Sequence, residues 1–131
     1  MIGLDTNVLV RFFAQDDPLQ SPKADEVMGS LTVEDPGWVG VAAILELVWV
    51  LGSKSHFDRK IIAKTLDQLL SREEIVIEQF ETVQNALQLF RKGGADFADC
   101  LIASSARAGG CKRTVTFDRI AARDTGMELL T

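Results

Sequence analysis

Four acidic residues stand where a carboxylate needs a special explanation. Asp5 ends the apolar run MIGL, and Asp118 follows the run TVTF. Glu46 lies within the apolar stretch AAILELVWVL, and Asp99 precedes the apolar part of GADFADCLIASSA. An ionised carboxylate among apolar neighbours must be paired, ligate a metal or take up a proton. Metal binding is therefore the first chemistry to consider.

Each acid also has an ordinary structural interpretation. Asp5, Asp96 and Asp99 can cap or lead the first turn of a helix, where free N–H groups favour a carboxylate. Asp118 can begin a turn. Glu46 can face solvent on a narrow polar stripe or pair with a buried arginine. These alternatives stay open for each residue taken singly.

Taken together, the acids predict a magnesium or manganese site. Acids that follow parallel strands meet at one edge of the sheet, and converging carboxylates repel one another unless a cation is present. Oxygen ligands suit the hard cations Mg²⁺ and Mn²⁺. Zinc prefers histidine and cysteine, and His56, Cys100 and Cys111 are too scattered to bind it. Without a phosphate-binding glycine loop, such a site indicates phosphodiester hydrolysis by metal-activated water.

The elements that position these acids alternate between strand and helix. Helices are predicted over residues 7–14, 21–31, 42–53, 58–71, 80–92 and 96–108. Extended segments are predicted over residues 2–5, 38–41, 75–77, 113–117 and 127–130. Short apolar strands separated by helices indicate an α/β fold with a mainly parallel sheet.

Length and composition are typical of one globular domain, which we expect to span residues 1–131. The chain is 47% apolar and 25% charged. Two cysteines outside any CxxC pair favour free thiols in a reducing cytoplasm. No basic signal sequence opens the chain. The longest apolar stretch, residues 38–52, contains Glu46 and is shorter than the ~20 residues of a membrane span. A cytoplasmic protein without a membrane partner is predicted.

The charge is unevenly distributed. A net charge of −5 alone argues against a nucleic-acid partner. Residues 91–123, however, carry seven basic and only three acidic side chains. A cation that neutralised those three acids would leave this segment strongly positive. A solvated surface with uneven charge is the simpler alternative.

These motifs, in this order, resemble the PIN-domain nucleases and, more narrowly, the VapC-type toxins of bacterial toxin–antitoxin pairs. The similarity extends over nearly the whole chain, and the matching pieces are IGLDTNVLVRFF, AAILELVWVL, FADCLIASSARAGGCK and TVTFDR. The resemblance implies a three-layer α/β/α sandwich around a mainly parallel sheet. It also implies a Mg²⁺- or Mn²⁺-dependent endoribonuclease that forms a homodimer and is inhibited by a cognate antitoxin.

The resemblance assigns roles by motif position. The catalytic and metal-binding set is Asp5, Glu46, Asp99 and Asp118. The supporting residues are Thr6, Asn7, Asp96 and Thr116. Contacts to RNA phosphates are a separate hypothesis for Arg11, Lys54, Lys112, Arg113 and Arg119. We expect Asp5 and Asp99 to hold the principal metal, and water activated by that metal to leave a 5′-phosphate and a 3′-hydroxyl.

Three other functions fit the sequence less well. A catalytically silent PIN-like adaptor that binds RNA or protein is the main alternative, and the intact acidic set speaks against it. An aspartyl-phosphate phosphatase needs an acid two residues after its nucleophile, where Asn7 stands. A receiver-like signalling domain needs paired acids after an early strand and a lysine after a late one, and neither is evident.

Overall fold

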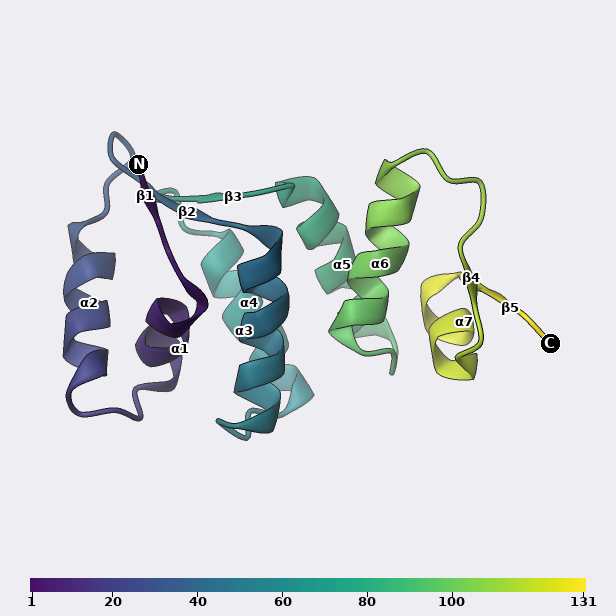
Figure 1. The fold of residues 1–131 in the computed structure, drawn as a ribbon, viewed down its shortest axis with the longest axis horizontal. Coiled ribbons are helices and arrows are strands. Elements are labelled where there is room, and N and C mark those ends of the chain that lie inside the picture. Colours follow the sequence, from purple (N-terminus) through teal and green to yellow (C-terminus); the bar gives the residue numbers. More distant parts are fainter. The chain divides into compact units, whose positions relative to one another are not determined.

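The computed structural model describes residues 1–131, in which strands and helices follow one another along the chain (Figure 1). The chain divides into two compact units, a first unit Met1–Glu78 and a second unit Gln79–Thr131. The expectation of one domain over residues 1–131 stays a prediction. No helix combines the length with the apolar character that a membrane crossing requires.

The first unit contains a parallel three-stranded sheet. Its strands are β1 (Ile2–Gly3), β2 (Gly37–Val39) and β3 (Ile75–Ile77), in the order β1-β2-β3. Gly37 lies opposite Ile2 on one side and Ile75 on the other. A Cβ atom at Gly37 would lie 2.8 Å from a methyl group of Leu4 and 2.9 Å from one of Leu31. The glycine therefore lets both leucine side chains pack closely over the central strand.

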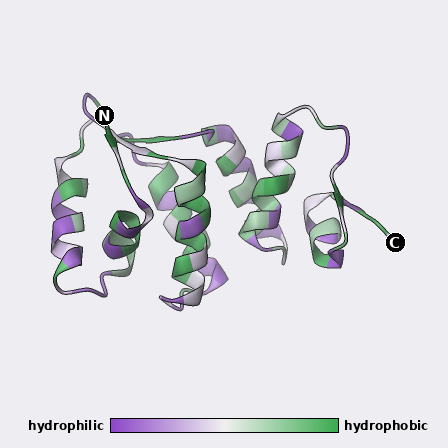
Figure 2. Cartoon of the chain, in the orientation of Figure 1, coloured by the Kyte–Doolittle hydropathy of each residue, from purple (hydrophilic) through white to green (hydrophobic).

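Four helices complete the first unit. They are α1 (Thr6–Ala14), α2 (Gln20–Ser30), α3 (Val41–Ser53) and α4 (Arg59–Leu70). Helix α1 contacts α2 and α3, and α3 contacts α4. Figure 2 shows α3 as predominantly apolar. The fully buried side chains of this unit include Leu9, Ile44, Leu47, Leu51, Leu66 and Leu69. Burial of each such side chain contributes about 2 kcal/mol, so these helices provide much of the unit's stability.

The second unit contains α5 (Phe80–Lys92), α6 (Phe97–Ala108), β4 (Val115–Thr116), α7 (Arg119–Thr125) and β5 (Glu128–Leu129). Strands β4 and β5 pair in parallel. Helix α5 packs on α6, where the rings of Phe90 and Phe97 meet edge to face with centroids 5.7 Å apart. Ala103, Ala121 and Met127 form a small core where α6 and α7 meet. Both thiols are free, with Cys100 buried and Cys111 exposed.

The predicted helices agree with the structure to within one residue at each end, but one helix was missed. Every strand pair is parallel, as predicted, although most strands are shorter than expected. The sequence pattern does not predict helix α7, because Asp118 after an extended segment is equally typical of a turn. Its carboxylate instead caps the helix by accepting a hydrogen bond from the Ala121 N–H at 2.9 Å. Gly126 ends α7 with a φ of 83°, which glycine adopts easily.

Candidate active site

Asp5 ends the first strand and caps the first helix. The Leu4 N–H donates to the Trp38 carbonyl at 2.9 Å, which carries the pairing of β1 with β2 up to the residue before Asp5. The Asp5 backbone is extended, and its Oδ1 accepts a hydrogen bond from the Thr6 N–H at 2.8 Å. Asp5 is exposed and its other carboxylate oxygen accepts no hydrogen bond. One oxygen at the carboxyl end of the parallel sheet is therefore available to a ligand.

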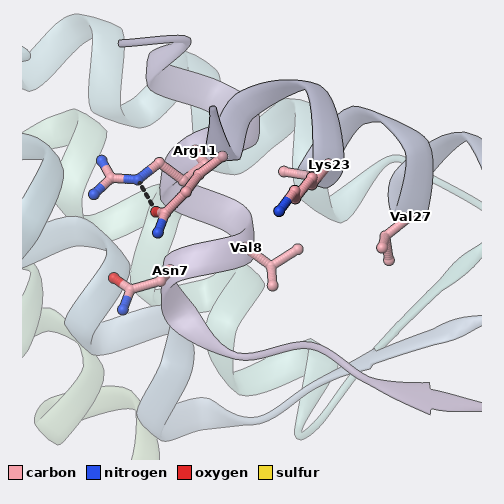
Figure 3. A pocket seen from close by; sticks show the side chains of 7 residues that line it. Asn7, Val8, Arg11, Lys23 and Val27 are labelled. Carbon is pink, nitrogen blue, oxygen red and sulfur yellow. Dashed lines mark hydrogen bonds between the residues drawn. The ribbon is translucent and has the colours of Figure 1, made fainter. Parts of the chain in front are cut away.

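The two polar residues after Asp5 lie in different environments. Thr6 is buried at 4% exposure, while Asn7 is exposed. Asn7 and Val8 line a pocket of about 270 Å³ between α1 and α2, with Lys23 and Val27 on the other side (Figure 3). Thr6 therefore supports the start of α1 from inside, and Asn7 is accessible beside Asp5.

Arg11, a predicted phosphate contact, is held by its own unit. It lines the same pocket, and its Nε donates to Gln20 Oε1 at 2.7 Å (Figure 3). Its guanidinium lies 3.3 Å from the Asp16 carboxylate and 3.9 Å from the Asp17 carboxylate. These contacts tie α1 to the segment that begins α2, so Arg11 has a structural task in addition to the one predicted.

Glu46 lies on the exposed side of α3, beside Leu45 and Trp49. The inference that Glu46 lies in a helix buried on all sides is wrong. Within the first unit its side chain faces solvent, as in the alternative interpretation. The reason is that Leu45, at 38% exposure, and Trp49, at 63%, extend the apolar surface of α3 onto its outer side. Composition alone did not reveal that Ile44 and Leu47 mark the inward side. The Glu46 carboxylate forms no ion pair and is available to a ligand.

Three aspartates come together in the second unit. Asp96 caps α6, because its Oδ1 accepts a hydrogen bond from the Asp99 N–H at 2.8 Å. Helix α6 leads away from this end, and the chain returns through β4 to Asp118 (Figure 1). There Thr116 Oγ1 accepts a hydrogen bond from the Asp118 N–H at 3.0 Å. Capping bonds and the return of β4 thus place the three carboxylates at one end of the unit.

The other two aspartates affect the ionisation of Asp99. The pKa of Asp99 is raised, first because the side chain is partly buried and then because the negative charges of Asp96 and Asp118 repel its own. A hydrogen bond between the Asp99 and Asp96 carboxyl groups acts in the same direction. A divalent cation would offset this repulsion, and carboxylate oxygens are the ligands that Mg²⁺ and Mn²⁺ prefer. The carboxylates fit such an ion chemically, although no three histidine, cysteine, aspartate or glutamate side chains form a group able to hold one.

The other predicted phosphate contacts are exposed and spread along the chain. Lys54 directly follows α3, and Arg119 directly follows Asp118 at the start of α7. Lys112 and Arg113 precede β4, and Arg113 donates two hydrogen bonds to the Glu128 carboxylate, at 2.8 and 3.1 Å. Arg107, one of the seven basic residues of the segment 91–123, shares a small pocket with Lys112 and Arg113. It lies in the last turn of α6, just before Gly109 and Gly110.

Comparison with known proteins identifies the class to which this fold and these acids belong. A model of the PIN domain family matches residues 2–125, so the chain belongs to the PIN domain family. It is also 26% identical over 117 residues to a VapC ribonuclease of Aquifex aeolicus (strain VF5), an alignment that covers 88% of this chain and 86% of that protein. The resemblance to VapC-type PIN proteins is thereby confirmed, as is the predicted α/β/α sandwich around a parallel sheet.

Proposed function

We propose that this protein is a divalent-metal-dependent endoribonuclease and the toxin of a toxin–antitoxin pair. Membership of the PIN domain family and the likeness to a VapC ribonuclease support the proposal. The observation that carries it is the environment of Asp99, whose pKa is raised by the partial burial of its own side chain and then by the negative charges of Asp96 and Asp118. Helix capping alone does not require several carboxylates close together, whereas a cation site does.

The proposed roles follow the family motifs. A bound Mg²⁺ or Mn²⁺ ion would be held principally by Asp5 and Asp99, with Glu46 and Asp118 completing the set, and it would supply an activated water and neutralise phosphate charge. The chain orients these ligands by hydrogen bonds. The Thr6 N–H fixes one oxygen of Asp5, and the Ala121 N–H fixes one oxygen of Asp118. In both cases the second oxygen remains available.

The remaining proposed residues support this set. Asn7 lies exposed beside Asp5 and would contact the substrate. Thr116 holds the backbone of Asp118, and Asp96 both caps α6 and bonds to Asp99. In the proposed reaction water is the nucleophile in place of the RNA 2′-hydroxyl, and the bond between phosphorus and the 3′-oxygen breaks, which leaves a 5′-phosphate and a 3′-hydroxyl.

RNA binding at a net charge of −5 requires local positive charge. We assign phosphate contacts to Arg11, Lys54, Lys112, Arg113 and Arg119. The proposal also includes one nuclease domain over residues 1–131, a homodimer, a cytoplasmic location and a cognate antitoxin as partner. These follow from the likeness to VapC-type proteins.

The proposal is tested by incubating total cellular RNA with purified protein freed of any antitoxin. Parallel reactions contain Mg²⁺, Mn²⁺ or EDTA, beside the variants Asp5→Asn and Asp99→Asn. Discrete fragments are expected with either metal, none with EDTA, and a loss of at least a hundredfold in rate in both variants. Circular dichroism of each variant checks that it is folded.

The second candidate is a PIN-like adaptor that binds RNA or protein without cleaving it. If folded wild-type protein leaves RNA intact in every metal and yet binds Mn²⁺ in a calorimeter, the adaptor takes the place of the nuclease. Cleavage that persists in EDTA would instead contradict metal dependence.

A further inference from the structure

The second unit contains a small basic pocket that none of the proposed metal-binding acids lines. It has a volume of about 70 Å³ and is lined by Arg107, Lys112 and Arg113, with Thr114 and Cys111 beside them. Liquid water occupies about 30 Å³ per molecule, so the pocket accommodates a compact polar group of a few atoms. Three cations around so small a space select for an anion.

The positive charge of this pocket is largely uncompensated. Arg107 and Lys112 form no ion pair. Arg113 gives both of its bonds to Glu128 from the single nitrogen Nη1, which leaves Nη2 and Nε as donors. Guanidinium groups match phosphate oxygens through paired hydrogen bonds, and the lysine adds a point charge. A phosphate group therefore fits the pocket in size, charge and donor pattern.

The pocket and the aspartates lie at opposite ends of the same helices. Asp99 is in the first turn of α6 and Arg107 in the last, about 12 Å apart along a helix that rises 1.5 Å per residue. Helix α7 likewise begins at Asp118 and ends beside the pocket at Thr125 (Figure 1). A phosphate held in the pocket is consequently not the phosphate positioned at the aspartates.

We propose that this pocket binds a backbone phosphate of the RNA strand some nucleotides away from the cleaved bond. The inference rests on the proposed nuclease function and adds Arg107 to the RNA contacts. It gives the protein a second anchor for the substrate, so that affinity depends on strand length. Oligonucleotides long enough to reach from the aspartates to the pocket bind tightly, and shorter ones do not.

Cys111 reports directly on occupancy of the pocket. It lines the pocket and is exposed, while Cys100, the other thiol, is buried. Wild-type protein is alkylated with iodoacetamide in EDTA, so that RNA is bound without being cut. An RNA of about ten nucleotides is expected to slow alkylation of Cys111 several-fold, and a dinucleotide to leave the rate unchanged. Long RNA that binds by fluorescence anisotropy without slowing alkylation would overturn the proposal. Protection by inorganic phosphate but not by RNA would overturn it too, in favour of a small-anion site.

Paired substitutions test the same pocket through affinity. In the double variant Arg107→Gln/Lys112→Gln, long RNA should bind about tenfold more weakly, and the slope of log K against log salt should fall by about 0.7, the loss of one phosphate contact on a single strand. The matched control Lys60→Gln/Lys64→Gln removes two exposed cations from α4 and should bind as wild type. Equal losses in both double variants would indicate general electrostatics and contradict the pocket.

These binding measurements separate the two proposals. Because they are made in EDTA, a protein that never cleaves RNA still gives a result for the pocket. An active nuclease whose Arg107→Gln/Lys112→Gln variant binds long RNA like wild type would refute the pocket and leave the nuclease intact. Unfolding in urea confirms that the variants are folded.

Discussion

Asp118 combines a structural task with a proposed chemical one, and two substitutions separate them. Its Oδ1 caps α7 through the Ala121 N–H. Asparagine caps helices about as well as aspartate, so Asp118→Asn should keep the free energy of unfolding and lose metal-dependent cleavage. Asp118→Ala should lose cleavage and also about 1 kcal/mol of stability. Urea unfolding and a cleavage assay on both variants make the comparison, and wild-type cleavage by Asp118→Asn would remove Asp118 from the ligand set.

Two buried serines predict opposite effects of the same substitution. The hydroxyl of Ser104, on α6, is buried without a hydrogen-bond partner. The hydroxyl of Ser21, on α2, donates to the Arg11 carbonyl at 2.9 Å. Ser104→Ala removes an unsatisfied polar group and should leave stability unchanged or raise it by about 1 kcal/mol. Ser21→Ala loses a bond between helices and should cost about 1 kcal/mol. Urea unfolding measures both, and a clear loss in Ser104→Ala would mean that its hydroxyl is satisfied in solution.

Among the helices, the start of α2 has a predictable dependence on pH. The pKa of Asp17 is lowered because its carboxylate accepts hydrogen bonds from the Gln20 and Leu19 N–H groups, with Arg11 adding to the effect. A carboxylate whose pKa is lowered in the folded state stabilises the fold at pH values above its ordinary pKa of 3.8. This contribution is lost as the pH falls through the pKa of the folded state. Wild type should therefore exceed Asp17→Ala in stability at about pH 6, with the difference shrinking towards about pH 3. A difference that grows on acidification would contradict this assignment.

Most elements were predictable because their signals are local. Apolar spacing and capping residues located the long helices, and β-branched residues located β3. Helix α7 was not predictable because its sequence RIAARDT is short and polar, although Asp118 and Gly126 mark its two ends. The side of α3 that faces the core was not predictable for the opposite reason, since apolar residues cover both of its sides. Local pattern cannot tell a core face from an exposed apolar one.

Motifs locate the acidic residues in the sequence, but the interactions between their charges follow only from the three-dimensional structure. The sequence predicted that Asp99 and Asp118 matter. The raised pKa of Asp99, however, comes first from burial of its side chain, then from the charge of Asp96, and then from that of Asp118, which β4 brings back towards the start of α6. Likewise the sequence places Arg107 in a basic segment, but only the turn after α6 brings it into one pocket with Lys112 and Arg113. Long-range proximity is the information that spacing does not contain.

At the scale of the whole molecule, an acidic protein that binds RNA should repel the RNA phosphates at its aspartates. Without metal, the Asp99 carboxylate repels the phosphates it is proposed to handle. Removal of one charge in Asp99→Asn should therefore tighten RNA binding in EDTA by about fivefold, or about 1 kcal/mol, while cleavage in Mg²⁺ is lost. Fluorescence anisotropy measures this, with Glu73→Gln as a control that makes the same charge change at an exposed position outside the second unit. Weaker binding by Asp99→Asn would contradict the proposed position of the RNA.

The most direct test of the central claim, hydrolysis by metal-activated water, is the chemistry of the RNA ends after cleavage. Fragments made in Mg²⁺ would be analysed for their terminal groups by ligation and kinase labelling. We expect a 5′-phosphate and a 3′-hydroxyl at each cut, and continued cleavage where the sugar at the cut lacks its 2′-hydroxyl. A 2′,3′-cyclic phosphate with a 5′-hydroxyl would mean that the RNA's own 2′-hydroxyl attacks, and would contradict the account.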